Sequence, residues 1–368
     1  MDEINKEYER RNVHIEVTVT NSCNCNCKYC FETHHHNNSN REEELRQLDL
    51  LKRYCDEFDI TKHDILNITF WGGEPMLNTN FLYEIIESTY KYPFVKYMMY
   101  TNGTLIDKFN EFINKDFIDS IIDRFTIQLS YDGEPHHTLM RCDNKELIFK
   151  TADLLIERGF KSLSFKATLS FNHLNLLPQV WDSYRELHEK YEFVRYSPTL
   201  DQSSVMNFND NFETWKSVLM EVAKKEMKFI EQHGYPLWSW FTNPGKLVCS
   251  LNNGVHMHND GNLYVCHGCP YSKNSSSFII GNTKNIKSLG DALNDGFNIS
   301  LRHRKCVECS AVACQVCHIS ELDKDIDDAV EYKEKWTSIV VNNQDRCRFY
   351  KYFGLIYNAL MIAIISRG

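Results

Sequence analysis

The fold expected for this chain is decided by one short stretch, CNCNCKYC, at residues 23–30. It directly follows an alternating, strand-like segment at residues 13–20 and places Cys23, Cys27 and Cys30 in a C-x3-C-x2-C spacing. Three thiolates on one loop can hold three irons of a cubane 4Fe–4S cluster, which leaves the fourth iron without a protein ligand. A zinc loop is the alternative, although zinc knuckles usually combine two C-x2-C pairs or a mixture of Cys and His. Cys25 lies outside this spacing, and we interpret it as an additional thiol.

Three further motifs each follow a strand-like segment. WGGEP occupies residues 71–75, TNGT residues 101–104 and SYDG residues 130–133. Two adjacent glycines carry no Cβ atoms, so the backbone of the first motif can approach a ligand closely. Asn-Gly and Asp-Gly are common in ordinary turns, and each of the other two motifs alone indicates little.

The cysteine loop and the GGEP motif together resemble those of the radical S-adenosylmethionine (radical SAM) superfamily. The resemblance implies that Cys23, Cys27 and Cys30 hold a 4Fe–4S cluster and that S-adenosylmethionine binds beside it. Ser130 and Arg141 would hold the methionine carboxylate, for which Arg offers a planar fork of donors. Tyr29 would pack near the adenine. The residues implied in cofactor binding are Tyr29, Gly72, Gly73, Glu74, Asn102, Ser130 and Arg141.

Strand-like and helix-like segments alternate along the first half of the chain. We expect strands at residues 15–20, 66–71, 95–101, 125–130, 163–169 and 193–197, and helices at residues 42–58, 80–90, 145–158 and 178–190. Such alternation predicts a parallel sheet of βα units, with cofactor sites at the carboxyl ends of the strands. With the resemblance, this gives an α/β fold: a partial (β/α)6 radical SAM barrel over residues 1–240.

A second group of cysteines follows residue 240, and it resembles a SPASM domain with a closing C-terminal helix (residues 241–368). Its opening, C-x11-G-x4-C, runs from Cys249 through Gly261 to Cys266. The resemblance implies two auxiliary 4Fe–4S clusters. Their ligands would be Cys249, Cys266 and Cys317 for the first, with Cys269 as a fourth ligand or an open iron in its place, and Cys306, Cys309, Cys314 and Cys347 for the second. Two gaps in the later run are each one residue shorter than the family's, so the partition stays open, as does zinc in two all-cysteine sites.

Composition narrows the class of protein. The 368 residues suffice for one large and one smaller domain. The absence of a signal peptide predicts a cytoplasmic protein, in which 14 cysteines indicate metal rather than disulfides. A formal net charge of -9 argues against nucleic acid binding through a basic field. The apolar segment 355–365 is shorter than the roughly 20 residues that span a bilayer, so we expect no membrane partner.

The resemblance implies an oxidoreductase that reductively cleaves S-adenosylmethionine to a 5′-deoxyadenosyl radical. That radical would abstract hydrogen from a peptide or protein substrate and give a crosslink or an oxidised residue, as in ribosomal peptide maturation. The expected partners are a flavodoxin- or ferredoxin-type electron donor and a separate leader-binding protein, since only about a dozen residues precede the first strand. The alternatives are an anaerobic sulfatase-maturing (formylglycine-forming) enzyme, a small-molecule dehydrogenase, and a non-enzymatic zinc or iron–sulfur scaffold.

One position bears on these alternatives. Sulfatase-maturing enzymes generally carry an Asp directly after the cysteine of the G-x4-C element, and this chain carries His267 there. A histidine can accept a proton near neutral pH, so His267 is a tentative catalytic residue. The structural alternative is a histidine that donates a hydrogen bond to a cluster sulfur.

Overall fold

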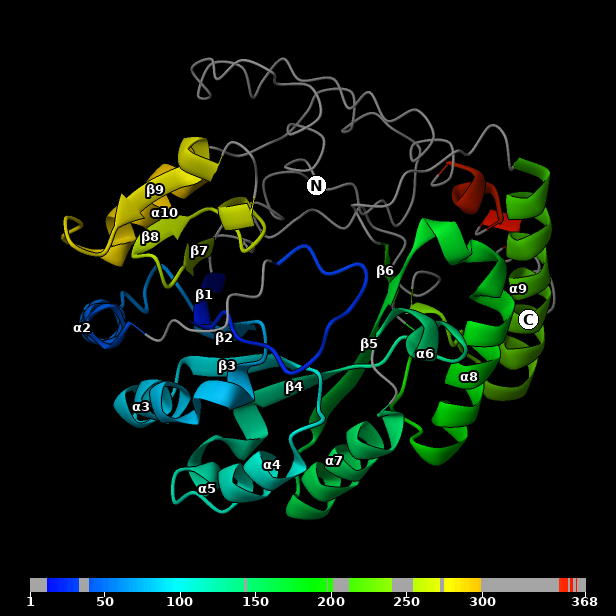
Figure 1. Ribbon diagram of the computed structural model, residues 1–368, viewed down its shortest axis with the longest axis horizontal. Helices are drawn as coiled ribbons and strands as arrows, with labels where there is room; N and C mark the ends of the chain where they lie inside the picture. Colours follow the sequence, from blue (N-terminus) through cyan, green and yellow to red (C-terminus); the bar gives the residue numbers. More distant parts are fainter. Residues whose placement is uncertain are drawn as a thin grey trace.

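The core of the protein is a single mixed sheet (Figure 1). The computed structural model describes residues 12–32, 40–141, 144–196, 198–200, 212–239, 254–271, 275–298, 351–356, 358–359 and 362. Within these residues the sheet has the order β6-β5-β4-β3-β2-β1-β7-β8-β9. The strands are β1 (Asn12–Thr20), β2 (Ile65–Gly72), β3 (Val95–Thr101), β4 (Phe125–Ser130), β5 (Ser162–Leu169), β6 (Pro198–Leu200), β7 (Gly254–Met257), β8 (Asn262–Tyr264) and β9 (Ile279–Asn282).

Strands β1 to β6 pair in chain order, all in parallel, which confirms the predicted α/β barrel-like core. Strand β7 adds to the free side of β1 in parallel, and β8 and β9 extend the sheet as antiparallel strands. The sheet therefore continues beyond residue 240, where we expected one domain to end. The boundary itself stays a prediction.

Helices follow the strands and cover the outer face of the curved sheet (Figure 1). They are α2 (Arg41–Asp56), α3 (Thr79–Thr89), α4 (Ile106–Ile113), α5 (Ile118–Ile121), α6 (His136–Met140), α7 (Lys145–Arg158), α8 (Leu177–Lys190), α9 (Phe212–His233) and α10 (Leu289–Asn298). Short 3-10 helices are η1 (Pro75–Asn78), η2 (Ile122–Arg124), η3 (Phe171–Leu176), η6 (Cys269–Tyr271) and η7 (Ser275–Phe278).

Local sequence explains where several of these elements begin and end. The Asn40 side chain accepts a hydrogen bond from the Glu43 backbone N–H and caps α2. Helix α7 ends at Gly159, whose φ of 103° suits a left-handed cap. In β4 and β5 buried and half-buried side chains alternate, so one set packs under the helices and the other, including Ser130 and Lys166, faces the interior of the curve.

The strand predicted at residues 193–197 is wrong in position. Strand β6 lies at Pro198–Leu200 instead. The backbone of Tyr196 pairs with the segment after α9: its N–H donates to Leu237 and its carbonyl accepts from Ser239. That segment lies about 40 residues further along the chain, so the sequence alone did not indicate the pairing.

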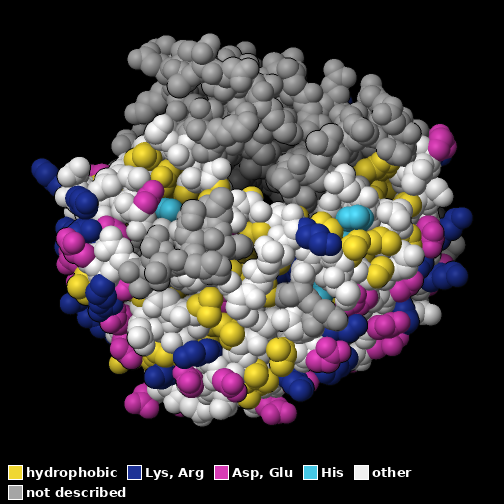
Figure 2. Space-filling view, in the orientation of Figure 1, with side chains coloured by type: hydrophobic (Ala, Val, Ile, Leu, Met, Phe, Trp, Pro, Cys, Tyr) yellow, Lys and Arg dark blue, Asp and Glu magenta, His cyan; other side chains and the backbone are white. Residues whose placement is uncertain are grey.

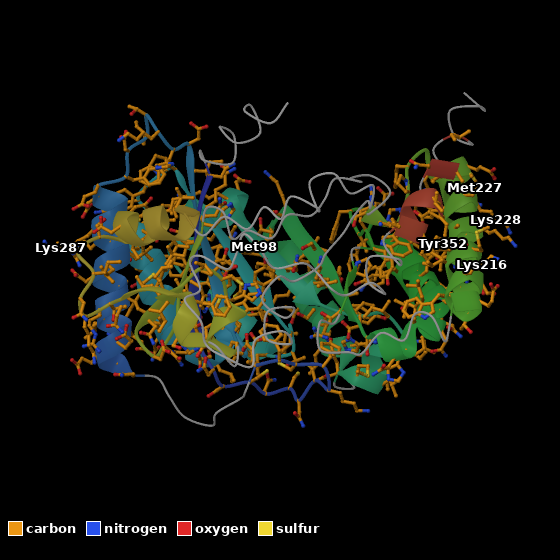
Figure 3. All side chains as sticks on the ribbon, turned by 90° about the horizontal axis from the view of Figure 1, so that it is seen from above. Met98, Lys216, Met227, Lys228, Lys287 and Tyr352 are labelled. Carbon is orange, nitrogen blue, oxygen red and sulfur yellow. The ribbon has the colours of Figure 1, made fainter. Side chains whose placement is uncertain are left out.

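The described C-terminal residues, 351–356, are helical and pack on α9. Figures 1 and 3 both place this segment, labelled at Tyr352, beside α9 near Met227. Phe353 is fully buried and its ring contacts that of Trp238, with centroids 5.2 Å apart. Helix-forming residues at this end of the chain thus close the far edge of the core.

The surface and the helices carry two further observations. On the face shown in Figure 2, the described Lys and Arg side chains are interspersed with Asp and Glu side chains. In the parts of the chain that the structure describes, no helix is both long and apolar enough to cross a membrane.

Glu226 of α9 makes the stability of the core depend on pH. It is fully buried, and its oxygens accept hydrogen bonds from the Trp181 indole (2.5 Å) and the Trp238 backbone N–H (2.8 Å). Burial raises the pKa of Glu226 from 4.5 to about 7. Because the unfolded chain releases this proton first, the contribution of Glu226 to stability falls as pH rises between these two values.

We expect Glu226→Gln to remove this part of the pH dependence. Urea unfolding followed by tryptophan fluorescence at several pH values between about 4.5 and about 7 measures it. The exposed Glu221 lies on the same helix, and Glu221→Gln is the control that should keep the wild-type slope. Equal slopes for wild type and Glu226→Gln would contradict the prediction.

Candidate active site

The predicted cofactor residues meet at the carboxyl ends of β1 to β4. The cysteine loop, residues 21–32, follows β1 and carries Cys23 and Cys27 half-buried and Cys30 exposed. Backbone hydrogen bonds tie this loop to its neighbours: Gly73 donates to Thr20, and Glu74 to Ser22, both at 2.9 Å. The chain therefore brings the three predicted cluster ligands directly beside the GGEP motif.

The two glycines of that motif are needed by the chain itself. A Cβ atom on Gly72 would lie 2.1 Å from the Thr20 carbonyl oxygen, and one on Gly73 would lie 2.5 Å from that of Ser22. Gly72 also has a φ of 120°, which side chains other than glycine rarely adopt. We expected the glycines to admit a ligand, but the close approach in the structure is that of the cysteine loop. Their contact with a cofactor stays a prediction.

Glu74 links the GGEP motif to the turn after β3. It is fully buried, and its oxygens accept hydrogen bonds from the Thr101 hydroxyl (2.7 Å) and from the backbone N–H groups of Asn102 (2.7 Å) and Met76 (3.1 Å). Burial raises the pKa of Glu74 to about 7. The structure thus shows this side chain holding a turn, and its direct role in cofactor binding stays a prediction.

Asn102 carries the same connection on to the cysteine loop. Its side-chain amide donates to the Asn24 carbonyl oxygen at 2.8 Å and lies 4.0 Å from the Cys23 sulfur. Asn24 in turn donates to the Thr104 hydroxyl at 2.8 Å. Sequence reasoning selected Asn102 but missed Asn24, because only the folded chain brings residues 24 and 104 together.

Arg141 and Tyr29 meet at a buried carboxylate that sequence reasoning also missed. Arg141 Nε donates to both oxygens of Asp132, each 3.2 Å away, and the Tyr29 hydroxyl donates to one of them at 2.6 Å. Burial alone would raise the pKa of Asp132, but Arg141 and the neighbouring histidines hold it at about 2. Asp132 appeared in the sequence only as part of a turn motif.

Ser130 lies at the end of β4, on the inner face of the sheet. Its register partner on β5 is Lys166. Burial lowers the pKa of Lys166 to about 8. The contact predicted between Ser130 and a carboxylate stays a prediction.

His267 lies inside the curved sheet, against β1 and β2. Its Nδ1 atom is 3.2 and 3.1 Å from the two oxygens of Glu16, and its ring stacks on Trp71 with centroids 3.9 Å apart. Burial disfavours the charged form of Glu16, but His267 and His256 beside it hold its pKa below the usual range. The turn after β8 is therefore joined to the barrel close to the GGEP motif. A catalytic role for His267 stays a prediction.

Of the predicted auxiliary cluster ligands, the structure describes Cys266 and Cys269. Both are buried, and the Cys269 backbone N–H donates to the Cys266 carbonyl at 3.1 Å. The remaining ones lie outside the described residues: Cys249, Cys306, Cys309, Cys314, Cys317 and Cys347.

The residues present at the cysteine loop fit a cluster better than a single metal ion. In the described parts of the chain, no three Cys, His, Asp or Glu side chains converge as ligands of one ion would. A cubane binds each thiolate at a different iron and needs no common point. The Cys25 backbone N–H donates to the Cys23 sulfur (3.4 Å), a contact typical of cluster thiolates.

Comparison with known proteins adds a family and a fold. Residues 17–190 match the sequence model of the family described as the radical SAM superfamily. No curated protein matches the chain. The chain resembles the solved structure of anSMEcpe with bound AdoMet, at 18% identity and a TM-score of 0.67, over 96% of this chain and 99% of that one. It also resembles Streptococcus suis SuiB bound to S-adenosylmethionine, at 14% identity and 0.54, over 84% and 73%. At these identities the likeness shows a shared fold.

Proposed function

This chain contains a radical SAM domain, and from that premise we propose that it modifies a peptide or protein substrate by radical chemistry. The observation that carries the proposal is the junction of three elements at one edge of the sheet. The cysteine loop is hydrogen-bonded to the GGEP motif, and the guanidinium of Arg141 lies 5.5 Å from the Tyr29 ring within the same loop. A cluster and a carboxylate-bearing cofactor would be held side by side there.

The cofactors, when bound, supply reductive cleavage of S-adenosylmethionine and a 5′-deoxyadenosyl radical that takes hydrogen from the substrate. The chain supplies ligands, orientation and shielding from water. Cys23, Cys27 and Cys30 would hold the cluster, and Arg141 with Ser130 would orient the methionine carboxylate. Glu74 and Asn102 fix the position of the cysteine loop through the hydrogen bonds given above.

We assign the C-terminal cysteines to two auxiliary 4Fe–4S clusters. The burial of Cys266 and Cys269 on adjacent turns supports this assignment, since apolar surroundings protect a cluster from solvent. Clusters near the barrel would accept the electron that a net oxidation or a crosslink releases. An external electron donor of the flavodoxin or ferredoxin type would reduce the first cluster.

A peptide substrate is supported by what related folds were crystallised with. anSMEcpe was solved with AdoMet and the Cp18Cys peptide, with a TM-score of 0.67 to this chain. SuiB was solved with the precursor peptide SuiA, with a TM-score of 0.52. A leader-binding protein, if the substrate has a leader, would be a separate partner.

The test combines cofactor cleavage with peptide mass. Protein reconstituted without oxygen is incubated with S-adenosylmethionine, dithionite and candidate peptides that contain Cys, Ser, Tyr or Trp. We expect 5′-deoxyadenosine to form, and one peptide class to lose two hydrogen atoms, or to gain a formyl group at a Cys or Ser if the enzyme matures sulfatases. Cofactor cleavage with conversion of a small molecule alone would favour the dehydrogenase alternative, and zinc without any cleavage would leave a scaffold protein.

A further inference from the structure

Asp132 is completely buried just beyond β4 and meets three separate segments of the chain. One oxygen accepts a hydrogen bond from the Tyr29 hydroxyl in the cysteine loop (2.6 Å). The other accepts one from the Thr168 backbone N–H of β5 (2.9 Å). Both lie 3.2 Å from Nε of Arg141, which follows α6. A buried carboxylate with this many donors is a fixed point of the structure.

The contact with Asp132 orients the guanidinium of Arg141 without using up its donors. An arginine side chain has five N–H donors in one rigid plane, one on Nε and four on the two terminal nitrogens. With the described residues, the hydrogen bonds of this side chain all run through Nε. The terminal nitrogens, which form the edge that binds a carboxylate bidentately, are therefore aimed by Asp132.

The same contact ties the guanidinium to the cysteine loop. Tyr29 stands between Cys27 and Cys30, and its hydroxyl contacts Asp132 and Arg141 Nε together. The backbone N–H of Lys28 donates to the carbonyl of Met140, the residue before Arg141, at 2.8 Å. Displacement of the loop would therefore displace the arginine as well.

We propose that Asp132 is a positioning residue that couples the cysteine loop to the carboxylate-binding edge of Arg141. It makes binding of the methionine carboxylate depend on a correctly folded loop. This inference rests on the proposed function, because it assumes that Arg141 binds that carboxylate. It adds a residue and a coupling that act on the ligand's carboxylate only.

The test is equilibrium binding rather than turnover. Binding of S-adenosylmethionine and of its decarboxylated analogue to the cluster-loaded protein is measured by anaerobic dialysis. We expect Asp132→Asn to weaken binding of S-adenosylmethionine by about tenfold, since it removes a charged partner of Arg141, and Tyr29→Phe by about threefold. Both variants should bind the decarboxylated analogue like the wild type. Glu134→Gln, which changes a nearby acid paired with Lys145 (3.3 Å), is the matched control and should leave both affinities unchanged.

The outcomes separate this inference from the proposed function. Equal weakening of both ligands, or no weakening of S-adenosylmethionine, would overturn the role of Asp132. Failure of the wild type to bind S-adenosylmethionine at all would instead contradict the proposed function. If Asp132→Asn does not fold, Tyr29→Phe still decides, because it removes one hydroxyl and leaves the packed ring in place.

Discussion

Alanine in place of Cys23, Cys27 or Cys30 is expected to lower the iron content by about four atoms per chain and to reduce 5′-deoxyadenosine formation to background. Each substitution removes one of three protein ligands from a cluster that already has one open iron, and an incompletely ligated cubane is lost on purification. Iron and sulfide analysis together with chromatography of the cleavage products measures both effects. With two auxiliary clusters in place, the wild type should carry about twelve irons.

Cys25 provides the matched control, since it belongs to the same loop but lies outside the spacing. Its side chain is buried, with 6% of its surface exposed. Cys25→Ala should therefore keep the wild-type iron content and lose only some stability. If Cys25→Ala lost iron while Cys23→Ala kept it, the assignment of the ligands would be wrong.

Alanine at Gly72 or Gly73 is expected to displace the cysteine loop and to prevent cluster retention. The added Cβ would lie 2.1 Å from Thr20 O at the first position and 2.5 Å from Ser22 O at the second. Neither contact can be relieved by a side-chain rotation, because both partners are backbone atoms. Overpacking and strain together should cost Gly72→Ala about 3 kcal/mol or more of unfolding free energy.

Gly234 separates the two causes of this effect. It has a φ of 77°, yet a Cβ there would meet nothing within 4 Å. Gly234→Ala therefore tests the positive φ alone and should cost about 1 kcal/mol. Chemical denaturation and iron analysis of the three variants compare strain with steric clash. Full cluster content in Gly72→Ala, with a loss of stability no larger than that of Gly234→Ala, would contradict the prediction.

Several elements could be predicted from the sequence because their signals are local. The strands at residues 95–101 and 125–130 and the helix at 145–158 begin and end where we expected them. Alternation at a period of two and an apolar stripe at the helical period are properties of consecutive residues. Helix α9 and strand β7, in contrast, were not predicted, and strand β6 was placed five residues too early.

The sequence by itself determined the cysteine spacing, the GGEP motif and the order of strands that places both at one edge of the sheet. These are short-range patterns, and the parallel order of the strands follows from their alternation with helices. Only the tertiary structure decided which groups hold these motifs in place. Asp132 is joined to Tyr29 across 103 residues and Asn24 to Asn102 across 78, and a buried hydrogen bond between distant residues leaves no periodic signal in either segment.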